Sequence, residues 1–208
     1  MPREITAFSN PLVKATRLLR DKKHRRDAGR FLAEGLRILT EAREAGRLPE
    51  TLFFVPTAAD RPLVTALVTA TEAAGGDAIE TTADILSKLS GKDNPGSVIG
   101  VYEEFLTPLH TIDRTSAAIW LVAERLRDPG NLGTILRTAD AVGAGGLILI
   151  DDCVDPFSVE AVRASMGALF TVPVARALGG VPALAAQRTR PTRRAEPGHR
   201  QPLSRGDV

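Results

Sequence analysis

The chain has 208 residues, of which 43% are hydrophobic and 25% charged, a composition typical of a folded globular protein. No apolar run approaches the ~20 residues that a membrane-spanning helix needs, and the first residues contain no apolar signal segment. One cysteine and three histidines exclude an internal disulfide and a Cys/His zinc cluster, so we expect a cytoplasmic protein without a structural metal.

The formal net charge of +2 is unevenly distributed along the chain. Residues 187–208 carry six Arg against two acidic residues, so the overall basicity comes mainly from this end. Residues 14–30 hold eight Lys or Arg against two Asp. This second cluster is either a solvated helix face or a surface for a polyanion such as nucleic acid.

In the first half of the sequence, predicted helices alternate with predicted strands. Asn10-Pro11 begins a helix over residues 10–26 with one apolar and one basic face, and Gly29 ends it. Further helices are predicted at 36–45, 63–74 and 83–89. Strands are predicted at 30–34, 52–55, 78–81 and 98–105. The alternation predicts an α/β domain over residues 1–105.

A second α/β unit is predicted after a linker at 106–115, which contains Pro108 and lacks periodicity. Its elements are a strand at 117–124 buried on both faces, a helix from about 132 to 142, a buried strand at 147–150, a helix capped by Ser158 and running to Met166, and a strand at 170–174. The first three form a parallel βαβ unit. Residues 185–208 are rich in Arg and Pro, and we expect them to be disordered.

The run Asp128–Ala144 (DPGNLGTILRTADAVGA) carries the strongest chemical signal. It follows a parallel strand, at the edge where α/β sheets usually bind ligands. Asn131 can cap the helix, Gly133 permits a close backbone approach, and Arg137 offers a planar fork of donors for phosphate. By itself the pattern also fits an ordinary crossover helix with an exposed Arg, and it is not the dinucleotide-binding glycine fingerprint.

This run resembles motif 1 of the SpoU/TrmH family of RNA ribose 2′-O-methyltransferases, and residues 161–174 resemble a second segment of the same family. Residues 10–14, 22–26, 31–35 and 92–98 are similar to the family's RNA substrate-binding domain. The resemblance covers about residues 5–180. It implies an L30e-like α/β sandwich at 1–105 and a SpoU-type α/β-knot domain with a parallel sheet at 116–184.

The resemblance also implies a function: methyl transfer from S-adenosylmethionine to a ribose 2′-hydroxyl of rRNA or tRNA by a homodimer. The motif's Asn and Arg correspond to Asn131 and Arg137. Arg137 either helps to deprotonate the hydroxyl or binds the adjacent phosphate and stabilises the developing alkoxide, and the second role is physically easier because a guanidinium stays protonated. Asn131 would then hold Arg137 or the nearby loop in place. The side chains expected to contact RNA are Lys14, Lys22, Lys23, Arg25, Arg26 and Arg163.

Two later family motifs, resembling Gly-x-Glu-x-x-Gly-Leu and Ile-Pro-Met…Ser-Leu-Asn-Val-x-x-Ala, do not occur in the sequence. In the family they build the knot and supply most contacts to S-adenosylmethionine. The methyltransferase domain is therefore expected to be partial, as in a truncated or frameshifted reading frame, with cofactor residues unassigned and little cofactor binding. The alternatives are an RNA-binding protein without catalysis and a nucleotide-binding α/β protein unrelated to RNA.

Three other features have ordinary interpretations. Asp151 and Asp152 follow a predicted strand, but without a third ligand they indicate a solvated loop rather than a metal site. Cys153 is expected to be a loop residue without chemistry, and the turn at Glu34-Gly35 to be structural. The three histidines have no recognisable Ser or Asp partners for nucleophilic catalysis.

Overall fold

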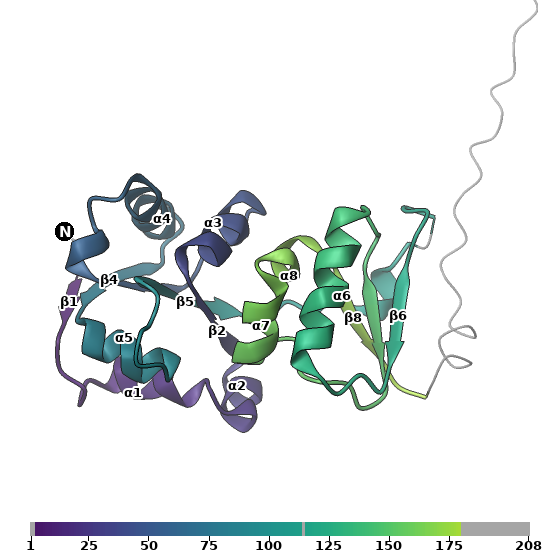
Figure 1. The fold of residues 1–208 in the computed structure, drawn as a ribbon, viewed down its shortest axis with the longest axis horizontal. Coiled ribbons are helices and arrows are strands. Elements are labelled where there is room, and N and C mark those ends of the chain that lie inside the picture. Colours follow the sequence, from purple (N-terminus) through teal and green to yellow (C-terminus); the bar gives the residue numbers. More distant parts are fainter. Residues whose placement is uncertain (1–2, 114, 180–208) are drawn as a thin grey trace, which may run out of the picture.

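A computed structural model describes residues 3–113 and 115–179, which form two α/β units lying side by side (Figure 1). The first unit is built on a mixed five-stranded sheet and the second on three parallel strands. The predicted α/β class is confirmed. Within the described residues, no helix has both the length and the apolar character needed to cross a bilayer.

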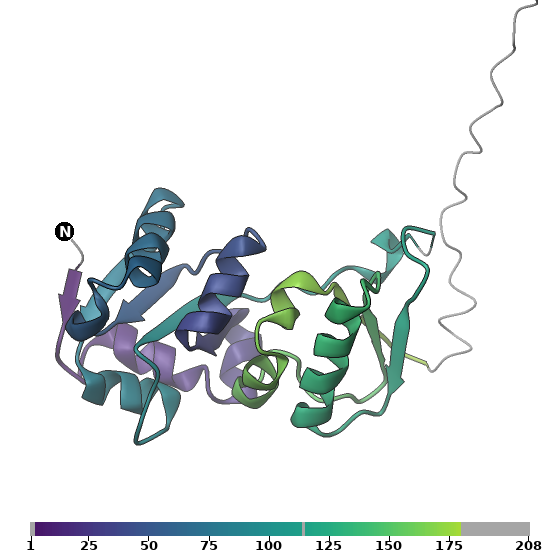
Figure 2. The same ribbon diagram turned by 45° about the horizontal axis from the view of Figure 1, so that its top comes forward.

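The first sheet has helices on both faces (Figure 2). Its strands in spatial order are β1 (Arg3–Ile5), β4 (Asp77–Thr81), β3 (Thr51–Phe54), β5 (Val98–Glu103) and β2 (Arg30–Glu34). The helices are α1 (Pro11–Leu18), α2 (Lys22–Ala28), α3 (Leu36–Glu44), α4 (Pro62–Ala73) and α5 (Ala83–Ser90). Apolar side chains of α1 and α5 pack on one face, and those of α3 and α4 pack on the other.

The helix predicted over residues 10–26 is in fact two helices, because α1 ends at Leu18 and α2 begins at Lys22. The Asp21 carboxylate accepts hydrogen bonds from the backbone N–H groups of Lys23 and His24, at 2.8 and 3.3 Å. An Asp side chain that bonds the nearby backbone in this way caps a new helix instead of continuing the old one. The single helix predicted over residues 10–26, with one apolar and one basic face, is therefore interrupted at residues 19–21.

The second sheet has the order β6 (Leu121–Glu124), β7 (Leu147–Ile150), β8 (Val174–Ala177), and its pairs are parallel, which confirms the predicted βαβ unit. Its helices are α6 (Pro129–Ala141), α7 (Val159–Ser165) and α8 (Ala168–Thr171). A Cβ placed on Gly133 would overlap both the side chain and the backbone of Ala164. The close approach allowed by Gly133 is therefore the packing of α6 on α7.

Three local predictions for this unit are wrong. The segment 170–174 is not a strand, since α8 ends at Thr171 and β8 begins only at Val174. Strand β6 is shorter than expected and lies at the sheet edge, where Val122 is 47% exposed, so it is not buried on both faces. Helix α6 is capped by Asp128, not by Asn131, because the Asp128 carboxylate accepts the Asn131 N–H at 2.6 Å. The predicted disordered segment 185–208 lies outside the described residues.

The two units share one hydrophobic core. Five aromatic side chains meet across the boundary, with ring centroids of neighbouring pairs 4.8 to 6.0 Å apart. They are Phe31, Tyr102, Phe105, Phe157 and Phe170. The segment 106–115, predicted to be a linker, contains a short helical turn, and its Thr107 N–H donates to the Val174 carbonyl. This packing fixes the orientation of the second sheet relative to the first.

Candidate functional site

Asn131 and Arg137 lie on the exposed side of α6, opposite the buried residues Leu132 and Leu136. The Arg137 guanidinium donates from Nη2 to the Thr134 hydroxyl at 3.2 Å. Asn131 is tied through its backbone to Asp128. Arg137 is thus positioned by Thr134, and among the described contacts none joins it to Asn131, so the structure does not bring the two predicted site residues together.

The carboxyl ends of β6 and β7 lie close to the start of α6. Here Arg127 forms an ion pair with Asp152, and this hydrogen bond and charge lower the pKa of the Asp152 carboxyl. The Gly179 N–H donates to the Asp151 carboxylate at 3.0 Å. Among residues 3–113 and 115–179, no group of three His, Cys, Asp or Glu side chains is placed to hold a metal ion. Cys153 is buried and hydrogen-bonded to the surrounding backbone.

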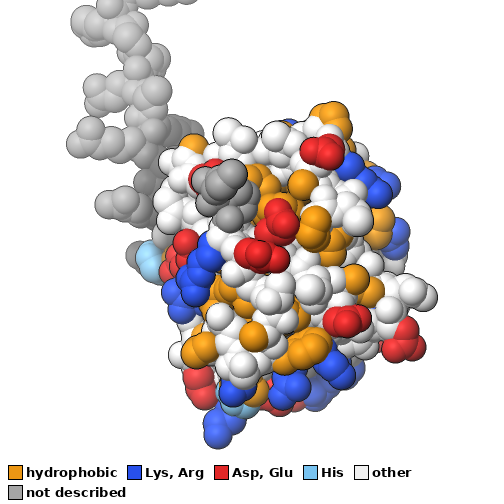
Figure 3. Space-filling view, turned by 90° about the vertical axis from the view of Figure 1, so that its left-hand side faces the viewer, with side chains coloured by type: hydrophobic (Ala, Val, Ile, Leu, Met, Phe, Trp, Pro, Cys, Tyr) orange, Lys and Arg blue, Asp and Glu red, His pale blue; other side chains and the backbone are white. Residues whose placement is uncertain are grey.

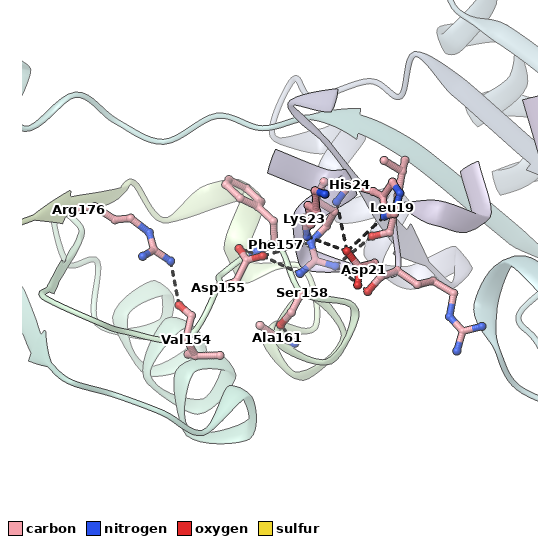
Figure 4. A network of polar contacts seen from close by, with 12 residues as sticks. Leu19, Asp21, Lys23, His24, Val154, Asp155, Phe157, Ser158, Ala161 and Arg176 are labelled. Carbon is pink, nitrogen blue, oxygen red and sulfur yellow. Dashed lines mark hydrogen bonds and ion pairs between the residues drawn. The ribbon is translucent and has the colours of Figure 1, made fainter. Parts of the chain in front are cut away.

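Arg25 is buried, with only 3% of its surface exposed, contrary to the prediction that it contacts RNA. Its guanidinium donates from Nη2 at 2.6 Å and from Nε at 3.2 Å to Oδ2 of Asp155, a residue labelled in Figure 4. Nη1 donates to the carbonyls of Leu19 and Arg20. The break before α2 turns Arg25 inward, and its donors are used within the protein.

Three of the other predicted RNA contacts are brought together on α2. Lys22, Lys23 and Arg26 are exposed and border one shallow hollow, and we call them the α2 surface. Lys22 and Arg26 also border a second hollow together with Asp151 and Asp152, at the end of β7. The α2 surface therefore adjoins the carboxyl edge of the second sheet. Lys14 is exposed on α1, apart from this group.

Arg163 is held by Glu34, a carboxylate whose side chain is only 8% exposed. Glu34 accepts from Arg163 Nη2 at 3.0 Å, from Lys92 Nζ at 3.2 Å and from the Gly96 N–H at 2.9 Å. Burial by itself raises the pKa of this carboxyl, but the Gly96 hydrogen bond and the two cations outweigh burial and lower it. Glu34 is therefore more than a turn residue, because it ties α7 to the first unit.

The lowered pKa of Glu34 predicts a pH-dependent contribution to stability. A carboxyl with a depressed folded-state pKa stabilises the protein fully above its unfolded pKa and loses this contribution as pH falls through the folded value. Urea unfolding between pH 3 and 7 is expected to show a steeper acid loss for the native chain than for Glu34→Gln. Glu44→Gln, on the exposed end of α3, is expected to follow the native chain. Parallel curves for all three proteins would contradict this role.

Several candidate binding residues are brought together only in the structure. A cleft of about 760 Å³ lies between the first unit and α7. Its basic lining residues are Arg17, Arg20, Lys88, Lys92 and Arg163. The basic run at 14–30 already included Arg17 and Arg20, but no local pattern indicates that Lys88 and Lys92 join them. Asp155, the partner of Arg25, likewise had no sequence signal beyond its place after a strand.

Comparisons with known proteins match both units. Residues 10–100 match the model of the MRM3-like substrate binding domain, and residues 118–190 match that of the SpoU rRNA Methylase family. The chain is 35% identical over 180 residues to a tRNA/rRNA methyltransferase of Synechocystis that is otherwise uncharacterised, covering 81% of this chain and 60% of the relative. It is 31% identical to a 23S rRNA uridine 2′-O-methyltransferase of Streptomyces viridochromogenes, covering 84% and 60%.

Among solved structures, an rRNA methyltransferase from Sinorhizobium meliloti is 41% identical and has a TM-score of 0.78, covering 85% of this chain and 65% of that chain. It has also been solved with AdoMet bound. The chain thus spans less than two thirds of the length of these relatives. Through its second unit the chain belongs to the SpoU rRNA methylase family, and its first unit is an MRM3-like substrate binding domain.

Proposed function

We propose that this chain supplies the RNA-binding unit and part of the catalytic unit of an S-adenosylmethionine-dependent methyltransferase that acts on a ribose 2′-hydroxyl of rRNA. One observation carries the proposal: Lys22 and Arg26 of the α2 surface border the hollow at the end of β7, in the unit that bears Arg137. Arg176 adds a third cation to this hollow, and the carboxylates in its wall are those of Glu104, Asp151, Asp152 and Asp155. RNA bound along α2 is then led to that sheet edge. The printed names of the relatives, among them an rRNA uridine 2′-O-methyltransferase, support this substrate.

In the proposed reaction, the cofactor supplies the methyl group and Arg137 acts on the RNA. A guanidinium remains protonated in proteins, so Arg137 binds the phosphate next to the reacting ribose and stabilises negative charge on the 2′-oxygen. Thr134 holds the guanidinium from one side and leaves its other donors toward solvent. A cationic fork held in this way is suited to a phosphate.

The described residues do not by themselves enclose a cofactor. An adenosine pocket needs apolar walls that exclude water. At the outer edge of the second sheet, Ile119 and Val122 are 45% and 47% exposed, and Leu178 beyond β8 is 82% exposed. We therefore expect no micromolar binding when S-adenosylmethionine is titrated calorimetrically into this chain. Micromolar binding, or a clear rise in melting temperature at saturating cofactor, would contradict this expectation.

A chimera tests the catalytic proposal. Residues 1–179 are joined to the C-terminal part of the Sinorhizobium meliloti relative, and transfer of a labelled methyl group to rRNA is measured. Arg137→Lys keeps the charge but loses the fork, so the rate is expected to fall by on the order of 10²-fold with RNA affinity nearly unchanged. Arg37→Lys on α3 is the matched control.

The main alternative is an RNA-binding protein without catalysis, which the exposed edge of the second sheet favours. A chimera that binds rRNA but transfers no methyl group would support this alternative. An active chimera in which Arg137→Lys has no effect would instead show that Arg137 is an ordinary exposed residue without a catalytic role. Homodimerisation, which the family resemblance implies, stays a prediction.

A further inference from the structure

We infer that the cleft between the first unit and α7 is a second binding site for the RNA backbone, which leads the strand onto the α2 surface. This inference rests on the proposed function. The cleft measures about 760 Å³, and charged and polar side chains form most of its wall. Such a lining suits a polyanion, whereas small-molecule pockets are predominantly apolar.

The basic side chains of the cleft come from both units. Arg17 belongs to α1, Arg20 to the turn between α1 and α2, Lys88 to α5, Lys92 to the loop after α5, and Arg163 to α7. Arg17, Arg20 and Lys88 are exposed, and within the described part of the chain they form no side-chain hydrogen bond or ion pair. Their charge is therefore available to a ligand.

The opposite sides of the cleft are held in place by the buried carboxylate of Glu34. It binds Lys92 from the first unit and Arg163 from α7, so the two cations keep a constant separation. Of the Arg163 donors, Nη2 donates to Glu34, whereas Nε is buried and has no acceptor among the described residues. A site whose cations are already positioned loses less conformational freedom when a ligand binds.

The absence of a side chain at Gly91 leaves room for one of the five cations of the cleft, Arg20. Gly91 ends α5 in the left-handed conformation, with φ of +74°. A Cβ at this position would overlap the guanidinium of Arg20. The Arg20 head group thus lies across the end of α5, close to Lys88 and Lys92 on the same wall.

The charge of the cleft favours an anion although acidic groups are present. Five cations face the carboxylates of Asp21, Asp93 and Glu160, and the Glu34 carboxylate binds two of the five, so the cations exceed the carboxylates by one. Asp21 already accepts hydrogen bonds from the start of α2, so part of its capacity is used within the protein. The resulting surface remains positive.

The cleft is continuous with the α2 surface. Asp21 borders both the cleft and the α2 hollow, and Lys22 and Arg26 border both that hollow and the one at the end of β7. A strand can therefore run from α5 past α2 to the sheet edge of the second unit. Figure 3 views the molecule from its N-terminal end, and Lys and Arg side chains gather along the lower edge, where α1 and α2 lie in Figure 1.

The test compares three variants of the full chain, each lacking three positive charges. The cleft variant is Arg17→Gln/Arg20→Gln/Lys88→Gln, the α2 variant is Lys22→Gln/Lys23→Gln/Arg26→Gln, and the control is Arg37→Gln/Arg43→Gln/Arg61→Gln. The control residues lie on α3 and at the start of α4, on the other face of the first sheet. Binding of a fluorescein-labelled RNA hairpin with a single-stranded tail is followed by anisotropy over a range of KCl concentrations, and thermal melts verify folding.

Each lost phosphate contact lowers the slope of log affinity against log salt by roughly 0.7 to 0.9. The cleft variant is expected to lose about two slope units, with an affinity loss of roughly tenfold or more, and the control is expected to keep the native slope. A native slope in the cleft variant with a reduced slope in the α2 variant overturns the cleft alone. Equal losses in cleft and control variants also overturn it, because total charge then explains binding. Absence of salt-dependent binding by the native chain overturns the proposed function as well.

Discussion

Replacing Arg25 by methionine is expected to lower the free energy of unfolding by about 3–5 kcal/mol, the usual cost of breaking a buried ion pair from one side. The substitution leaves the Asp155 carboxylate, 11% exposed, without its cation. It also leaves the carbonyls of Leu19 and Arg20 without their donor. Urea unfolding measured by circular dichroism gives the change.

Lys23→Met on the same helix is the matched control, since it removes an equal charge from an exposed position and is expected to change stability by less than about 0.5 kcal/mol. If Arg25→Met and Lys23→Met prove equally stable, Arg25 is not the buried anchor described above. The prediction from the sequence that Arg25 contacts RNA would then stand. The double variant Arg25→Met/Asp155→Leu is expected to recover part of the loss, because no uncompensated charge then remains buried.

Phe31→Ala is expected to cost about 3–5 kcal/mol, the range for truncating a fully buried aromatic side chain. Phe31 has no exposed surface and contacts four other rings, two of them from the second unit. Its ring centroid lies 4.8 Å from that of Phe157. The cavity would therefore open between the units as well as within the first one.

Phe8→Ala provides the comparison, because Phe8 is 47% exposed and its truncation is expected to have a small effect. A double-mutant cycle with Phe157→Ala tests the coupling directly. Contacting residues are expected to be non-additive by 0.5 kcal/mol or more. Strict additivity would show that the aromatic cluster does not join the units energetically.

These two buried contacts bear on function through geometry. Arg25 and Phe31 belong to the first unit, whereas their partners Asp155 and Phe157 precede α7 in the second. Together they hold the α2 surface at a constant position relative to α6 and Arg137. Weakening either contact is therefore expected to change the position of the α2 surface relative to Arg137. Every side chain proposed to contact RNA would still be present in such a variant.

Much of the local structure could be predicted from short stretches of sequence. Asn10 accepts the Leu12 N–H as a helix cap, and Ser158 does the same for Ala161. Gly29 ends α2 with φ of +64°, and β6 pairs with β7 in parallel as the βαβ pattern requires. These features depend on neighbouring residues, so local propensity determines them. The resemblance to the family came from the same kind of contiguous pattern.

The tertiary structure decided which charged residues are buried and which face solvent. Arg25 looks like its exposed neighbours in the sequence, but it meets Asp155, 130 positions away. Glu34 and Arg163 are 129 positions apart, and strand β6 is partly exposed although its apolar run predicts a buried strand. Hydrophobic periodicity describes each element alone and contains no information about what packs against it. The sequence by itself therefore determined most of the elements and the family, whereas packing between distant segments decided the ion pairs, the cleft and the surface available to RNA.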